Sequence, residues 1–195
     1  YKPGDYNTEV AYMGCRTRVM SNAYDRTREV TCGRGNLSFT SINLPRLAIE
    51  AHHDVDKFFK MLDEKIDLVI EQLMARSKKV RNYPFLMGQG VWLDSDKLGP
   101  DDEVGEVLKH GSLTLGFIGL AETLKALIGK HHGESEEAQQ LGLKIVGHMR
   151  DRMDEETKKT GFNYTLIATP AEGLSGRFVK MDQKRYGKIP GVTDR

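Results

Sequence analysis

Three strand-type segments alternate with helix-type segments along this chain, and this order constrains its fold more than any other feature. Residues 36–44 have the alternation of a strand that ends at Pro45, 112–120 is a short, mostly apolar run, and 163–170 is again strand-like. Apolar residues recur at steps of three and four over about 54–80 and 119–130, and a further helix is predicted over about 135–159. Strands separated by helices imply parallel crossovers, so the predicted fold class is α/β.

The predicted helix ends support this division. Asp54 is a suitable N-cap for the first helix, and the residues NYP at 82–84 end it. Ser135, followed by acidic residues, starts the last predicted helix, and Gly161 stops it. Because functional residues of α/β folds gather at the carboxyl ends of strands, a site is expected just after the three strands.

Composition limits the function classes. The 195 residues hold 29 Lys and Arg against 28 Asp and Glu, a net charge of +1, which argues against a general nucleic-acid or membrane binder. We find no apolar run near the roughly 20 residues that span a bilayer. The chain has two cysteines and no recognisable export signal, so it is predicted to be cytoplasmic and to form one domain.

Several familiar sites are excluded by spacing. The chain has no GxxxxGK[ST] phosphate loop, and its Gly-x-Gly segments lack the third glycine of a dinucleotide fingerprint. It has no CxxC pair, so we expect no metal site within it. The pairs His52-His53 and His131-His132 are best read as solvated or helix-end residues, because adjacent helical side chains diverge. His110, just before the 112–120 strand, stays open as a residue at a strand mouth.

The segment ATPAEGLSGR (168–177) follows the last predicted strand. Pro170, Gly173, Ser175 and Gly176 would let backbone N–H groups approach an anion, a following helix would add its positive end, and Arg177 could lend charge. An ordinary strand–turn connection is the commoner explanation of this pattern. The residues alone therefore leave open whether the turn binds phosphate.

Both cysteines lie in the loop-rich amino-terminal region. Cys15 sits in a Gly-Cys-Arg context, where a tight loop tip and the neighbouring Arg16 and Arg18 would favour a reactive thiolate. A buried inert thiol is the commoner fate of cysteine, and a disulfide with Cys32 is sterically possible. Composition and spacing leave these alternatives open.

Four segments together make the chain recognisable. YMGCRTRV, TCGRGNLSFTSINLPR, HGSLTLGFIGLAET and NYTLIATPAEGLSGRF closely resemble the anaerobic (class III) ribonucleoside-triphosphate reductases, in the same order and over essentially the whole chain. The resemblance implies a glycyl-radical enzyme that converts ribonucleoside triphosphates to deoxyribonucleoside triphosphates. It also implies a ten-stranded α/β barrel with a central finger loop, of which residues 1–195 would be a central part of the catalytic domain.

The resemblance assigns roles to particular residues. Cys15, in a finger loop at about 10–20, matches the cysteine that becomes a thiyl radical and removes the 3′ hydrogen of the ribose. Asn36 matches the active-site asparagine, whose amide suits the ribose hydroxyls. The turn at about 169–177 matches the substrate-phosphate loop, and Cys32 has no catalytic role that the resemblance transfers. The substrate-binding residues implied are Thr169, Ala171, Glu172, Gly173 and Ser175.

Other parts of the family pattern are missing from residues 1–195. The glycyl-radical loop, the paired CxxC motifs of the zinc site and the regulatory nucleotide-binding domain are absent, so the chain is expected to be an excerpt that is inactive alone. S-adenosylmethionine and an iron–sulfur cluster are expected only in a radical-SAM activating partner, and the full-length protein is expected to be a homodimer. Two alternatives stay open: another glycyl-radical enzyme acting on a small acid or diol, and a radical-free nucleotide-binding module.

Overall fold

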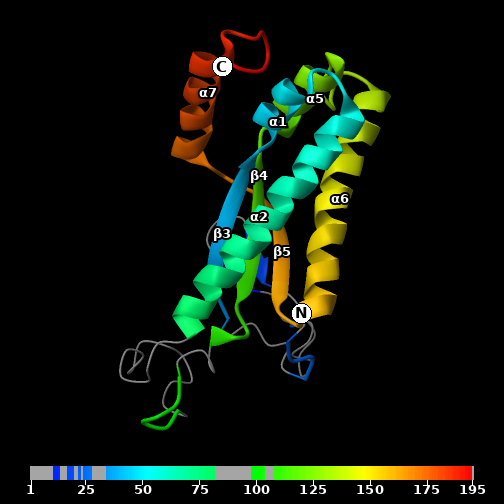
Figure 1. Ribbon diagram of the computed structural model, residues 1–195. Coiled ribbons are helices and arrows are strands. Elements are labelled where there is room, and N and C mark those ends of the chain that lie inside the picture. The colour runs from blue at the N-terminus through cyan, green and yellow to red at the C-terminus, as the bar shows by residue number, and fades with distance from the viewer. Residues whose placement is uncertain are drawn as a thin grey trace. The chain divides into compact units, whose positions relative to one another are not determined.

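The computed structural model describes residues 11–13, 17–19, 22, 24–27, 34–81, 98–103 and 108–194 (Figure 1). Its strands and helices occur in the following order: β1 Ala11–Met13, β2 Thr17–Val19, β3 Asn36–Asn43, α1 Leu44–Ala51, α2 Val55–Arg81, β4 Ser112–Ile118, α5 Leu120–Ile128, α6 Glu136–Thr160, β5 Asn163–Ala168 and α7 Glu172–Tyr186. The predicted alternation of strands and helices is confirmed.

Strands β3, β4 and β5 form one sheet in that order, with β4 in the centre. At the start of β4 the Ser112 N–H donates to the carbonyl of Gly35, just before β3, at 2.8 Å. At its end the carbonyl of Phe117 accepts from the N–H of Thr169, just after β5, at 3.0 Å. Since starts pair with starts and ends with ends, the strands run parallel, as Figure 1 also shows. The predicted α/β class is therefore correct.

The chain divides into two compact units, and the long elements contribute to both. Unit 1 contains residues 1–40, 70–114 and 153–165, and unit 2 contains residues 41–69, 115–152 and 166–195.

Helix α1, in unit 2, was not predicted. Pro45 was expected only to end the preceding strand, but it occupies the first turn of α1, where proline is tolerated because its missing N–H has no helical partner. The Asn43 side chain accepts from the N–H of Arg46 at 3.4 Å and so caps the helix. One face of α1 packs into the core; its buried residues are Leu44, Pro45, Leu47, Ala48 and Ala51.

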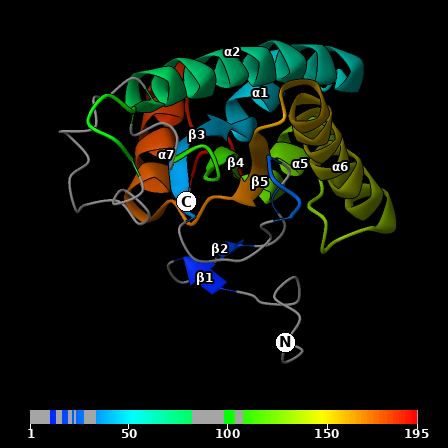
Figure 2. The same ribbon diagram turned by 90° about the horizontal axis from the view of Figure 1, so that it is seen from below.

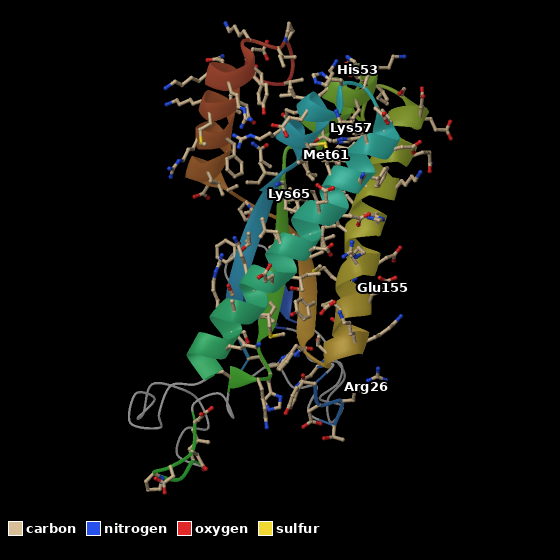
Figure 3. The ribbon with its side chains drawn as sticks, viewed as in Figure 1. Arg26, His53, Lys57, Met61, Lys65 and Glu155 are labelled. Carbon is tan, nitrogen blue, oxygen red and sulfur yellow. The ribbon has the colours of Figure 1, made fainter. Side chains whose placement is uncertain are left out.

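The core of unit 2 includes residues of the apolar stripes predicted over 54–80 and 119–130. Asp54 caps α2 by accepting from the N–H of Lys57 at 2.9 Å, as expected. Just before α2 the His53 ring lies 3.1 Å from the carbonyl of Leu127, and in the first turn of α2 the Lys57 Nζ donates to the carbonyl of Glu50 at 2.8 Å (Figure 3). The fully buried side chains of unit 2 include Phe58, Leu62, Ile66, Leu115, Leu124, Ile145 and Met149.

In unit 1, β1 and β2 pair antiparallel, with Met13 opposite Thr17 (Figure 2). His110 is 6% exposed and lies in a polar network rather than at an open strand mouth. Its Nδ1 is 3.0 Å from the Asn22 amide, and its carbonyl accepts from the Asn163 amide at 3.1 Å. The Tyr24 ring packs perpendicular to the imidazole, with the ring centroids 5.4 Å apart.

Tyr164 in unit 1 gives a pH-dependent prediction. Burial, together with the nearby Glu156 carboxylate, raises the pKa of Tyr164 to about 12. Its hydroxyl is buried and has no hydrogen-bond partner among the described residues. Because the folded protein holds this proton more tightly than the unfolded chain, the stabilisation is complete below pH 10 and is lost as the pH rises towards 12.

Tyr164→Phe should therefore flatten the fall in melting temperature of the native gene product between pH 10 and 12. At pH 7 it should change the free energy of unfolding by less than about 1 kcal/mol, since the hydroxyl it removes makes no hydrogen bond with the described residues. Melting curves of the two proteins across this pH range provide the check. An equally steep alkaline loss in the variant would contradict the assignment.

Candidate functional site

The candidate site residues fall into three groups. Cys15 and Cys32 lie outside the described residues, so the structure does not test their roles. The strands β1 and β2, which pair antiparallel, flank residue 15 in the sequence. Asn36 belongs to unit 1, whereas Thr169 and the turn that follows it belong to unit 2.

Asn36 begins β3 and is exposed. Hydrogen-bond geometry assigns its amide nitrogen to the branch that faces three oxygens: the carbonyls of Ser38 and Ser112 at 3.0 and 3.2 Å, and the Thr114 hydroxyl at 3.3 Å. The Thr114 hydroxyl in turn lies 2.8 Å from that of Thr165. These contacts use the donors of the amide and leave Oδ1 as the acceptor for a ligand.

In unit 2 each of the three parallel strands leads directly into a helix. Strand β3 leads into α1, β4 into α5, and β5 into α7, and Figure 1 shows the three transitions at the same end of the sheet. A pocket of about 300 Å³ lies at these transitions and is lined by residues from all three. This is the place that the strand order predicted for a site.

Two of the helix starts at this pocket carry no side-chain cap. Gly119 precedes α5 with a φ of 81°, and Ala171 precedes α7 with a φ of 47°. A left-handed backbone is unusual for alanine. No side chain of the described residues accepts from the first N–H groups of either helix, so these groups and the positive helix ends are available to an anion in the pocket.

The structure corrects the predicted turn at 169–177 in one respect. Most of it is helical, because α7 begins at Glu172 and includes Gly173 and Ser175. The Ser175 N–H donates to the Ala171 carbonyl at 2.7 Å, and its hydroxyl lies 3.1 Å from the Glu172 carbonyl, so only the N–H groups before it are available. Arg177 is exposed on α7.

Thr169 is fixed by a contact that the sequence did not predict. Its hydroxyl lies 2.7 Å from the hydroxyl of Ser41 on β3, and the two side chains meet above Gly116 in the central strand. A Cβ at position 116 would stand 2.5 Å from the Ser41 Oγ and still closer to the Thr169 Oγ1. The absence of a side chain at Gly116 is therefore what permits the Ser41–Thr169 hydrogen bond.

Acidic side chains also reach the pocket. Glu122 lies in the first turn of α5, and Asp182 is 2% exposed on α7. The Arg46 guanidinium lies 2.6 Å from the Asp182 carboxylate, so this buried charge is paired. The described residues contain no group of three or more metal-ligating side chains, and no described helix is long and apolar enough to cross a membrane.

Comparison with known proteins identifies the family. Residues 1–195 match the family model described as anaerobic ribonucleoside-triphosphate reductase. The enzyme of that name from Salmonella typhimurium is 38% identical over 191 residues, which cover 94% of this chain and 26% of that protein. The one from Enterobacteria phage T4 is 33% identical over 197 residues, which cover 95% of this chain and 31% of that protein. The chain thus spans between a quarter and a third of the length of these relatives.

Solved structures show the same fold. The anaerobic ribonucleotide reductase from Thermotoga maritima with citrate in the active site matches with a TM-score of 0.65 at 18% identity, over 80% of this chain and 28% of that one. A structure of the Thermotoga maritima enzyme in complex with dATP and CTP matches with a TM-score of 0.64 at 19% identity, over 80% of this chain and 25% of that one.

Proposed function

Since the chain belongs to the anaerobic ribonucleoside-triphosphate reductase family, we propose that it forms the part of a catalytic domain that holds a ribonucleoside triphosphate during its reduction. The observation that carries the proposal is the pocket at the ends of three parallel strands, where two uncapped helix starts supply free N–H groups. Such groups bind phosphate oxygens without a lysine or a metal.

The start of α7 is the proposed phosphate site. The N–H groups of Glu172 and Gly173 would donate to phosphate oxygens, with Ala171 setting their direction through its left-handed backbone. A Cβ on Gly173 would meet no atom within 4 Å, so the protein leaves the side-chain position of this glycine open. Thr169 and Ser175 line the approach.

Asn36 is the proposed partner of the ribose. Its amide nitrogen is committed to protein oxygens, so its Oδ1 would accept a hydrogen bond from a ribose hydroxyl. This hydrogen bond would orient the ribose hydroxyl before the 2′ hydroxyl leaves as water. The support is the hydrogen-bond geometry of the amide together with the family match.

Cys15 is the proposed radical residue. Its sulfur, as a thiyl radical, would take the 3′ hydrogen atom and leave a carbon radical on the ribose. The 2′ hydroxyl would then leave as water, two electrons and the protons that balance them would come from formate or a dithiol, and Cys15 would return the hydrogen atom to the 3′ carbon. A glycyl radical outside residues 1–195 would supply the oxidising equivalent. The role of the chain is to place and shield the reacting groups.

The proposal extends to partners and location. The intact protein would be a cytoplasmic homodimer, activated by a radical-SAM enzyme that carries S-adenosylmethionine and an iron–sulfur cluster. The family's zinc site would lie outside this chain, which has no CxxC pair. We infer no nucleic-acid or membrane partner.

The proposal is tested by anaerobic turnover of the native gene product. The protein is incubated with its activating enzyme, formate or a dithiol, and each ribonucleoside triphosphate in turn, and deoxyribonucleotides are measured by chromatography. Formation of a deoxyribonucleoside triphosphate is expected. If none forms while a small acid or diol is consumed, a different glycyl-radical enzyme is indicated; nucleotide binding without any turnover indicates a binding module.

Asn36→Ala should lower kcat by about a hundredfold, the typical effect of removing one oriented polar group from a reacting centre. KM for the triphosphate should change little, because the phosphate site lies at α7. Steady-state rates of the activated protein provide the check. Gln72→Ala is the matched control: Gln72 is an exposed amide in unit 1 that accepts from Arg76 at 3.3 Å, and its removal should leave the rates unchanged. A normal kcat in the Asn36 variant would exclude the assigned role.

A further inference from the structure

Helix α7 is held by polar contacts more than by apolar burial. Of its fifteen residues, all of which the structure describes, Asp182 alone is buried. The Asp182 Oδ1 accepts from the Arg46 Nε at 2.7 Å, and its Oδ2 accepts from the Asn43 amide at 2.7 Å. Both partners belong to the start of α1, where Asn43 is also the N-cap.

The same face of α1 makes a second polar contact with α7. Glu50, one turn beyond Arg46, accepts a hydrogen bond from the Tyr186 hydroxyl. The positions 43, 46 and 50 are spaced three and four apart, as are 182 and 186, so each set lies on one helix face. The two helices therefore meet along a row of directional contacts.

Directional contacts fix what apolar packing leaves adjustable. An ion pair with an added amide hydrogen bond sets both the rotation of α7 about its axis and its position along α1. The same face of α7 lines the pocket through Ser175, Phe178, Val179 and Asp182. A shift of α7 about or along its axis would therefore change the position of its first N–H groups relative to the pocket.

We propose that Asp182 is a positioning residue that, through Arg46 and Asn43, aims the start of α7 at the phosphates of the substrate. Asp182 lines the same pocket, but it lies ten residues after Glu172, about 15 Å along the helix from the proposed phosphate site at the helix start. This inference rests on the proposed function. It adds that phosphate recognition depends on a charge pair between α1 and α7.

The test separates phosphate recognition from general folding. Asp182→Asn removes the charge, keeps the size, and sets an amide donor against the Arg46 and Asn43 donors. In the activated native gene product we expect KM for the triphosphate to rise by roughly tenfold to a hundredfold, the loss expected when one hydrogen bond to a charged phosphate is broken. The Ki of the same ribonucleoside without phosphates, measured as a competitive inhibitor, should stay unchanged.

Asp63→Asn is the matched control. Asp63 is paired with Arg152 at 2.5 Å and accepts from His148 at 2.8 Å within unit 2, but it does not line the pocket. Its variant should leave both constants as in the wild type. Arg46→Lys is a second test, since it keeps the charge but loses the fork of two nitrogens; it should raise KM in the same direction by less, and it serves if Asp182→Asn does not fold.

Two results would overturn the inference. One is an unchanged KM in both variants; the other is an equal rise of KM and of the nucleoside Ki, which would make Asp182 merely structural. Failure of the wild type to turn over any triphosphate would instead refute the proposed function, so the two failures are distinguishable.

Discussion

Replacing Cys15 with alanine in the native gene product is expected to abolish deoxyribonucleotide formation, with a residual rate below detection. The proposed reaction begins with hydrogen abstraction by this sulfur, and a methyl group cannot carry the radical. Binding of the triphosphate should persist, because the proposed phosphate site lies at α7 and the proposed ribose contact at Asn36. Turnover under anaerobic conditions and equilibrium binding of the labelled triphosphate measure the two properties separately.

Cys32→Ala is the matched control for this experiment. It removes the other cysteine of the chain, to which no catalytic role is assigned, and it should retain turnover. Cys15→Ser adds a test of the chemistry. The serine O–H bond is too strong for its hydrogen atom to be removed by a glycyl radical, so this variant should be as inactive as the alanine variant. Turnover comparable to that of the wild type in either Cys15 variant would contradict the assignment of Cys15 as the thiyl radical residue.

The elements whose pattern repeats over many residues could be predicted from the sequence. The apolar stripe of Phe58, Leu62 and Ile66 predicted both α2 and its buried face, and Asp54 predicted where the helix starts. The sequence does not reveal helix α1, because this helix is only eight residues long and begins at a Leu-Pro pair, and a proline after a strand pattern predicts the end of the strand. The Asn-Leu-Pro-Arg order is nevertheless a helix start, with Asn43 as its cap and proline in its first turn.

Helix α7 was missed for a different reason. Its first turns contain Gly173 and Gly176, which have low helix propensity, and its one buried residue is a carboxylate. Neither feature produces an apolar stripe. Asp182 and Tyr186 contact α1 instead, and their partners lie more than a hundred positions away in the sequence, so these contacts give no local signal.

In the candidate site, too, only local sequence signals could be predicted. The sequence located the turn after β5 as a phosphate candidate, because small residues after a strand are a local signal. It did not reveal that Ser41 and Thr169 meet above Gly116, since this contact joins three strands and depends on their register. The Asp182–Arg46 pair was equally invisible from the sequence. The roles of Cys15 and Asn36 came from resemblance to a family.

A single added methyl group at Gly116 should disturb both the fold and the site. In Gly116→Ala the new Cβ would stand 2.5 Å from the Ser41 Oγ and closer still to the Thr169 Oγ1, so both side chains must move and their 2.7 Å hydrogen bond must break. The position is buried in the central strand, which leaves little room to relax. Overpacking and the lost hydrogen bond together should cost about 3 kcal/mol or more.

Melting temperature and the triphosphate KM are the two measurements for this variant. The melting temperature should fall, and KM should rise in the protein that remains folded, because Thr169 leads directly into the start of α7. Gly147→Ala is the matched control: it makes the same substitution inside α6, where the new Cβ meets no atom within 4 Å, and it should stabilise the protein by up to about 1 kcal/mol.

A compensating change shows whether the hydroxyls are the cause. Adding Thr169→Ala to Gly116→Ala removes the closest atom and, with Ser41→Ala as well, leaves the Ser41 Cβ at 3.3 Å as the nearest neighbour. The triple variant should recover most of the lost melting temperature, yet its triphosphate KM should stay raised, because the bridge that anchors Thr169 is gone. Recovery of both the melting temperature and the KM would mean that the Ser41–Thr169 hydrogen bond contributes to packing alone. A Gly116→Ala protein as stable as the wild type would contradict the predicted clash with Ser41 and Thr169.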